Sequence, residues 1–118
     1  IFLILIIISC SKEIPSDQTV ERNGITYEVN SDTPFTGVSS TYHENGQVDE
    51  RITFKDGKLD GLVETYRQNG ELIVSRNYKD GKLDGMMTTW LDNGEIESER
   101  NYVDGELDGD VTWWNSPW

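Results

Sequence analysis

Acidic side chains at a fixed spacing are the residues of this chain that most invite a chemical role. The hexapeptide Asp-Gly-Lys-Leu-Asp-Gly stands at residues 56–61 and 80–85, and Asp-Gly-Glu-Leu-Asp-Gly stands at residues 104–109. Aspartates at the first and fifth places with Gly at the sixth resemble the start of an EF-hand calcium loop. The twelfth place, which needs a bidentate Glu, holds Arg67, Leu91 or Asn115. We therefore expect these aspartates to form turns, with no metal site and no cofactor.

Groups suited to catalysis are scarce. His43 is the only histidine and stands next to an expected turn, so an exposed surface histidine explains it better than a general base. Carboxylate pairs such as Asp49 with Glu50 could serve acid and base roles, but such pairs mean little in a chain with 22 acidic residues. The sequence shows no zinc-ligand spacing, no nucleophile elbow and no phosphate-binding Gly motif before a helix. We predict that the protein is not an enzyme.

Tryptophans gather at the C-terminal end of the chain, at Trp113, Trp114 and Trp118. Aromatic side chains of this kind can anchor a protein partner, so all three are candidates for partner contact. A terminal repeat also needs a plug over its last apolar layer. We favour the plug over the anchor.

The only cysteine, Cys10, follows an apolar run of eight residues and Ser9. The run is too short to span a bilayer as a helix. It resembles a secretory signal, and residues 7–10 resemble a bacterial lipobox with cleavage before an acylated Cys10. The alternative is an ordinary buried cysteine. We predict a signal peptide over residues 1–9, truncated because no initiator Met or basic segment precedes it, then a lipid-anchored tether over residues 10–22. The expected location is the bacterial cell envelope.

Charge and length limit the remaining classes. The chain has 118 residues and a net charge of -12, with 10 basic residues against 22 acidic ones. Such a charge repels nucleic acid and anionic lipid headgroups, so we expect neither as a partner of the folded part. The apolar content of 35% is low for one thick core. It is enough for a repeat protein, in which each unit buries its apolar side against its neighbours.

The hexapeptide belongs to a repeat of 24 residues. Asn-Gly pairs at 45, 69 and 93 and Asp-Gly pairs at 56, 80 and 104 are strong β-hairpin signals. They predict an all-β domain over residues 23–118, an antiparallel meander of repeated hairpins on one sheet. Its parts are a lead-in (23–36), three repeats (37–60, 61–84, 85–108) and a partial repeat (109–118). The predicted turn and bend residues are Asn45, Gly46, Asp56, Gly57, Gly61, Asn69, Gly70, Asp80, Gly81, Gly85, Asn93, Gly94, Asp104, Gly105 and Gly109.

Side-chain parity distinguishes the two kinds of turn. A two-residue type I′ turn at Asp56-Gly57 sets Phe54 opposite Leu59, whereas a three-residue loop ending in Gly70 sets Tyr66 opposite Leu72. Leu59 and Tyr66 are seven residues apart, so a regular strand would place them on opposite faces. We expect a one-residue bulge at Asp60-Gly61 to restore both to one face. That face would carry Val48, Ile52, Phe54, Leu59, Tyr66, Leu72, Val74, Tyr78, Leu83, Trp90, Ile96, Tyr102, Leu107 and Trp114, with Val63, Met87 and Trp113 on the other.

The recurring glycines, aromatic residues, Asn-Gly pairs and Asp-Gly-Lys-Leu-Asp-Gly motifs resemble the bacterial variant of the MORN repeat, as in YwqK-like proteins known as antitoxins. The resemblance covers most of the chain after the tether. It implies a twisted meander of hairpins with no catalytic residues to carry over. Exposed strand edges at both ends leave self-association open. With the predicted anchor, two functions are considered, both by binding a protein. One is a lipid-anchored protein-binding or scaffold module at the cell envelope, and the alternative is an antitoxin that neutralises a toxin by protein contact.

Overall fold

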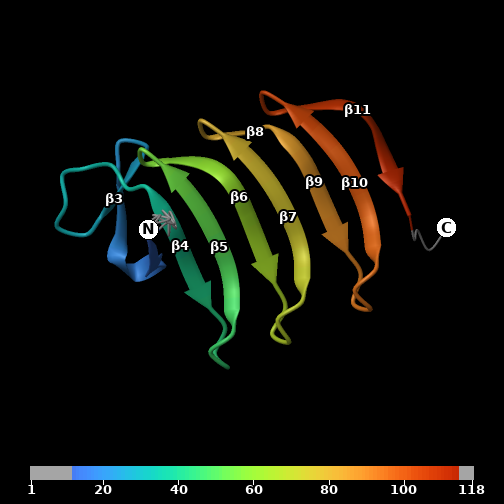
Figure 1. Ribbon diagram of the computed structural model, residues 1–118, viewed down its shortest axis with the longest axis horizontal. Helices are drawn as coiled ribbons and strands as arrows, with labels where there is room; N and C mark the ends of the chain where they lie inside the picture. Colours follow the sequence, from blue (N-terminus) through green and yellow to red (C-terminus); the bar gives the residue numbers. More distant parts are fainter. Residues whose placement is uncertain (1–11, 115–118) are drawn as a thin grey trace, which may run out of the picture.

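The computed structural model describes residues 12–114, which form one nine-stranded sheet and a separate two-stranded hairpin (Figure 1). The sheet order is β1-β4-β5-β6-β7-β9-β10-β11, with β8 beside β7, and all pairs except β1–β4 are antiparallel. This confirms the predicted meander of hairpins. The elements are β1 (Glu13–Pro15), the 3₁₀ turn η1 (Ser16–Gln18), β2 (Thr19–Arg22), β3 (Ile25–Glu28), β4 (Gly37–Tyr42), β5 (Val48–Lys55), β6 (Lys58–Tyr66), β7 (Leu72–Lys79), β8 (Lys82–Leu83), β9 (Gly85–Trp90), β10 (Ile96–Val103) and β11 (Glu106–Trp113).

The two kinds of turn have the geometry that the pairing predicts. Asp56 and Gly57 both have positive φ, as do their equivalents one and two repeats later, which is the type I′ signature. Phe54 pairs with Leu59 across this turn. At the Asn-Gly loops only the Gly has positive φ, and Tyr66 pairs with Leu72 across the second of them. The Asn side chain completes each loop, since Asn69 Oδ1 accepts the N–H two residues ahead at 3.0 Å.

The predicted one-residue bulge at the second Asp-Gly pair is wrong. Ile52 pairs with Val63 and Phe54 pairs with Leu59, so a step of two residues on β5 faces a step of four on β6. Two extra residues, unlike one, leave the alternation of side chains unchanged. Gly61 lies inside the insertion with φ +106, and the later repeats have the same insertion at Gly85 and Gly109.

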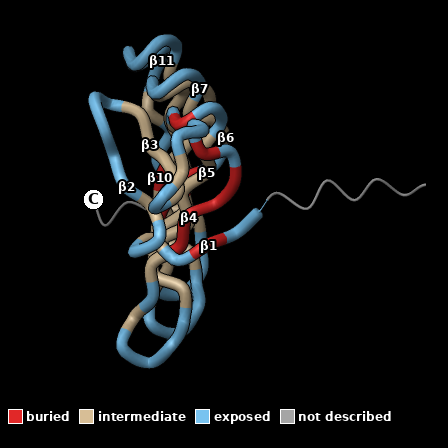
Figure 2. The backbone as a smooth tube through the Cα atoms, turned by 90° about the vertical axis from the view of Figure 1, so that its left-hand side faces the viewer, coloured by how far each residue is buried: buried red, intermediate tan, exposed pale blue. Residues whose placement is uncertain are grey.

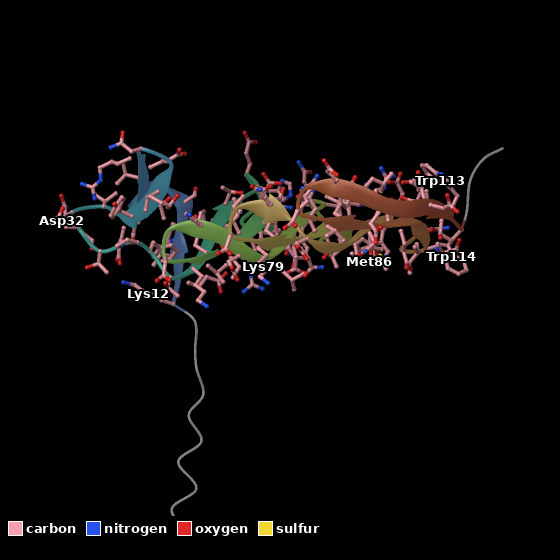
Figure 3. The ribbon with its side chains drawn as sticks, turned by 90° about the horizontal axis from the view of Figure 1, so that it is seen from above. Lys12, Asp32, Lys79, Met86, Trp113 and Trp114 are labelled. Atoms are coloured by element: carbon pink, nitrogen blue, oxygen red, sulfur yellow. The ribbon has the colours of Figure 1, made fainter. Side chains whose placement is uncertain are left out.

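The prediction of a single apolar face is therefore wrong as well. We call the side of the sheet on which the β2–β3 hairpin lies the hairpin face, and the other side the open face (Figure 3). Each Asp-Gly end places its aromatic–leucine pair, such as Phe54 and Leu59, on the hairpin face. Each Asn-Gly end places its aromatic–aliphatic pair, such as Tyr66 and Leu72, on the open face. Val63, expected on the polar side, is on the hairpin face and only 5% exposed.

The segment before the repeats is part of the fold, which corrects the interpretation of residues 12–22 as tether. Ile14 is buried, and β1 pairs in parallel with β4. The β2–β3 hairpin crosses the predicted boundary between residues 22 and 23. Alternating apolar and polar residues in this polar stretch are enough for short strands once the sheet supplies a surface. The remaining tether and signal residues, with Cys10, lie outside the described residues.

The buried side chains concentrate where this lead-in meets the first repeats (Figure 2). The Phe35 and Phe54 rings are 5.9 Å apart, centre to centre. Gly57 donates its N–H to Phe35 O at 2.8 Å and accepts from Thr26 N at 2.9 Å. Toward β11 the sheet is a single layer with large apolar side chains left partly exposed. The buried apolar residues are Ile14, Phe35, Val38, Val63 and Val74.

Candidate interaction surface

Each Asp-Gly turn is hydrogen-bonded to the repeat before it. Gly81 N donates to Leu59 O at 2.8 Å, and Asp80 N donates to the Asp60 carboxylate at 3.3 Å. The third repeat shows the same two bonds to Leu83 and Asp84, at 2.7 and 3.5 Å. The Leu-Asp pair at the fourth and fifth places of the hexapeptide therefore supplies two acceptors for the next turn. The sequence carried a signal for this role, because the acceptor Asp and the next turn Asp are always 20 residues apart.

In the described part of the chain, residues 12–114, the Leu-Asp pair of the third repeat has no turn of a next repeat beside it. Leu107 and Asp108 stand where Leu59 and Asp60 stand two repeats earlier. Asp108 Oδ2 accepts a long bond from Asn101 Nδ2 at 3.5 Å on the neighbouring strand β10. Among residues 12–114 no further turn lies beside this pair. The acceptors that join one repeat to the next are thus presented at the end of the sheet.

We expect Asp60→Ala to lower the free energy of unfolding by about 1 kcal/mol, because the Asp80 N–H loses its charged acceptor. Asp108→Ala is the matched control. It makes the same change at the equivalent site without a following turn, so its effect should stay within about 0.5 kcal/mol. Urea denaturation of the two variants measures the difference. Equal losses would show that the acceptor role of the carboxylate contributes nothing.

A polar cluster on the open face holds β1 in place. The Glu13 carboxylate accepts from Ser40 Oγ at 2.8 Å and from Arg51 Nη2 at 3.1 Å. Burial lowers the pKa of Arg51, but the charge and hydrogen bond of Glu13 outweigh it and raise this pKa above its ordinary value. Tyr66 lies at the edge of the cluster, beside a surface groove of about 400 Å³. Arg51 Nε is buried without a hydrogen-bond partner among residues 12–114, so the guanidinium is satisfied only in part. Since the Glu13 carboxylate binds side chains of both β4 and β5, the cluster serves attachment of β1 better than chemistry.

Burial, followed by the negative charge of Glu64, raises the pKa of Tyr66 above its ordinary value. A phenol whose folded pKa is raised contributes stability that is complete below its unfolded pKa, about 10, and is lost as the pH rises through the folded pKa. We expect the difference in tyrosinate absorbance between wild type and Tyr66→Phe to appear only above pH 10. If the absorbance difference had its midpoint at the ordinary pKa of tyrosine, about 10, the burial of Tyr66 beside Glu64 would be contradicted.

The Asn-Gly ends are joined by side chains. His43 Nε2 lies 2.9 Å from Tyr66 O and 3.5 Å from the Asp49 carboxylate. Its side chain is only 18% exposed, so the expectation of an exposed surface histidine is wrong. Arg67, one repeat later, donates from Nη2 to Trp90 O at 3.0 Å. Both side chains connect one loop to the next, a role that their equal place in the repeat could have indicated.

A groove of about 450 Å³ lies between the β2–β3 hairpin and the sheet, beside the point where the two are in contact. Phe54 and Leu59 supply apolar lining, and Glu21, Lys58 and Asp80 supply charged groups of both signs. Among residues 12–114 no group of three or more His, Cys, Asp or Glu could hold a metal ion. In the same part of the chain, no helix is long and apolar enough to cross a membrane.

The two edges of the sheet differ. At the N-terminal edge stands β1, a strand of three residues that contains Pro15 and is tied to β4 and β5. At the other edge stands β11, eight residues long, which pairs only with β10 among the described strands (Figure 1). Seven of the eight residues of β11 are exposed. The most exposed large apolar side chains here are Leu107 at 50%, Trp113 at 55% and Trp114 at 60%.

The tryptophans do not form the plug that the sequence favours. Trp113 pairs with Ser98 and projects from the hairpin face, while Trp114 projects from the open face (Figure 3). The Arg100 guanidinium lies 5.8 Å from the Trp113 ring centre. Because the two rings point to opposite sides, they cannot cover one layer together. Trp118 lies outside the described residues.

The comparisons with known proteins agree with this repeat geometry. A family model described as the MORN repeat variant matches residues 35–56, 59–80 and 83–104. Each match begins two residues before the Gly that opens a repeat, at Gly37, Gly61 or Gly85, and it stops at the Asp of the next Asp-Gly turn. No curated protein and no solved structure matches the chain.

Proposed function

Since the chain belongs to the family of MORN repeat variants, which suggests a repeat and binding module, we propose that it is a non-enzymatic protein-binding module held at the bacterial cell envelope by a lipid on Cys10. The proposal has two parts, binding and attachment. Each part is supported by different residues and is tested separately.

The observation that carries the binding part is the single-layer end of the sheet. Leu107, Trp113 and Trp114 are each at least half exposed, and they lie within one stretch of eight residues. Leu107 and Trp113 leave apolar surface uncovered on the hairpin face, and Trp114 does so on the open face. Exposed apolar surface at one end of a sheet is a feature of sites that bind a partner. Tryptophans at such a surface are frequent anchors of protein contacts. A protein partner is favoured over nucleic acid because the chain carries a net charge of -12.

Binding is tested by pull-down from solubilised bacterial envelope fractions with residues 12–118 as bait. We expect a specific protein to be retained by the wild-type chain and lost with the Trp113→Ala and Trp114→Ala double variant. Tyr42→Ala is the control, since Tyr42 is 51% exposed at the far end of the sheet. If the wild-type chain, the double tryptophan variant and Tyr42→Ala retained the same proteins, the assignment of the binding surface to Trp113 and Trp114 would be wrong.

The attachment part is supported by the order of residues at the N-terminus. An apolar run of eight residues, Ser9 and then Cys10 suit a signal cleaved before a lipid-modified cysteine. Acyl chains contribute about 0.8 kcal/mol per buried methylene, so two or more hold a folded domain on a membrane without a spanning helix. The first described strand begins at Glu13, so the anchor would stand within a few residues of the sheet.

Attachment is tested by labelled palmitate in a bacterial host expressing the full chain with a complete signal sequence. We expect label on the wild-type protein, none on Cys10→Ala, and release of that variant from the membrane fraction. A cytosolic, unlabelled protein that co-purifies with a toxin would support instead the antitoxin alternative.

A further inference from the structure

Among the described strands, the outer edge of β11 is unpaired, and its side chains alternate between charged and apolar groups. Glu106 and Asp108 pair with residues of β10 that project from the open face, so their side chains project there too. Leu107 and Trp113 project from the hairpin face. Asp110 adds a third carboxylate to the strand, whose described residues include no basic side chain. An approaching strand would therefore meet acids on one side and apolar groups on the other.

We propose that β11 binds an extended segment of a protein partner as an added strand, in which lysines or arginines alternate with apolar residues. This rests on the proposed protein-binding function and names the chemistry of the partner. Strand addition supplies backbone hydrogen bonds for affinity, while alternate side chains supply selectivity. Basic residues of the partner would face Glu106 and Asp108, and apolar residues would contact Leu107 and Trp113.

The repeats themselves show that this edge can accept backbone donors. In each earlier repeat, the carbonyl oxygen of the Leu and the carboxylate of the Asp accept two N–H groups from the next turn, as Leu59 and Asp60 do. Leu107 and Asp108 offer the same two acceptors at the end of the array. An incoming backbone with two free N–H groups would reproduce a contact that the fold already makes twice.

Charge argues against a second copy of this chain as the occupant. Antiparallel pairing of two β11 strands would bring the carboxylates of Glu106, Asp108 and Asp110 close to those of the other copy. Like charges facing each other across a sheet are destabilising. The opposite edge is equally unsuitable, because β1 is three residues long and contains Pro15, which lacks a backbone donor.

The test uses three fluorescent octapeptides and the full chain with its N-terminal apolar run kept in solution by detergent, residues 1–118. The first peptide alternates lysine and valine. The second has the same sequence, but every other backbone nitrogen, on the edge that would face β11, is methylated. Methylation removes the N–H donors of that edge and keeps the charge of the lysines. The third alternates glutamate and valine. We expect the first to bind, and the other two to bind at least about tenfold more weakly by fluorescence anisotropy.

The protein variant is Glu106→Lys with Asp108→Lys, and its control is Glu44→Lys, an exposed change in the first Asn-Gly loop. We expect the double variant to lose at least about tenfold in affinity for the lysine peptide, and the control to lose far less. Equal binding of the methylated and unmethylated peptides to wild type would overturn strand addition, and this measurement needs no variant to fold.

Further outcomes separate this proposal from the function on which it rests. If the envelope pull-down retains its protein with both wild type and the double lysine variant, the binding function stands and the β11 site is wrong. If light scattering shows a dimer of the wild-type domain that the lysine peptide does not dissociate, the edge is occupied by a second copy and the proposal fails.

Discussion

Gly57→Ala is expected to lower the melting temperature far more than Gly81→Ala, although both glycines occupy the second position of the same type I′ turn. Their φ values are +78 and +83, so the cost of a side chain in the left-handed region, about 1–2 kcal/mol, is common to both. A Cβ on Gly57 would also collide with the Ile25 side chain and lie 2.8 Å from Thr26 O, whereas Gly81 has nothing within 4 Å. Overpacking of this kind adds about 1–3 kcal/mol.

Thermal denaturation followed by circular dichroism measures both glycine variants. For a domain of this size, each kcal/mol corresponds to roughly 4–8 °C in melting temperature. Gly105→Ala, at φ +84 and with an equally open surrounding, should behave as Gly81→Ala does. If all three variants melted together, the packing of the β2–β3 hairpin on the first Asp-Gly turn would be disproved.

Phe35→Ala is expected to lower the free energy of unfolding by about 3–5 kcal/mol, the range for removing a buried aromatic ring. Phe35 is 4% exposed, and its ring packs 5.9 Å from that of Phe54. It also joins three parts of the fold, since its O accepts from Gly57 N and its N donates to Thr26 O at 2.9 Å. Loss of the ring removes the contact that holds the lead-in on the first repeat.

Urea denaturation gives the size of the Phe35 effect, and hydrogen exchange gives its location. We expect the amides of Thr26 and Gly57 to lose protection in Phe35→Ala more than the amides of β9 and β10. Tyr42→Ala removes an aromatic ring that is 51% exposed, so it should cost much less. A loss from Phe35→Ala no greater than that from Tyr42→Ala would contradict the assigned core.

The asymmetry of the core explains why the candidate binding surface lies where it does. Ile14 and Phe35, from the segment before the repeats, are buried together with Val38 of the first repeat, and that segment closes the N-terminal end of the described sheet. A repeat protein gains its stability from contacts between neighbouring units, and the last unit has a neighbour on one side only. In the described residues that unit ends in β11. The surface that a further repeat would cover is the one we propose for a partner.

The candidate site was visible in the sequence only in pieces. Trp113 and Trp114 stand out by residue type, and strand alternation predicts that they lie on opposite faces. That Trp113, and not Trp114, shares a face with Leu107 depends on the register between β10 and β11. In the sequence, Asp104 and Asp108 resemble the start of a calcium loop. A motif along the chain does not show that Asp108 lies on the last described strand of a sheet. The acceptor role of Asp60 was missed for the same reason, since its partner Asp80 lies 20 residues away in the next turn.

The hairpins, their period and both turn types could be predicted from residue order. Those features depend on residues within one turn: positive φ at Asp-Gly and Asn-Gly sites, and the parity of the few residues on either side. The two-residue insertion at Gly61, the division of apolar pairs between two faces, and the docking of residues 13–35 on the first repeat became apparent only in the folded sheet. These three features depend on which strands become neighbours. Strand pairing joins residues that are far apart in the sequence, so residue order alone does not reveal it.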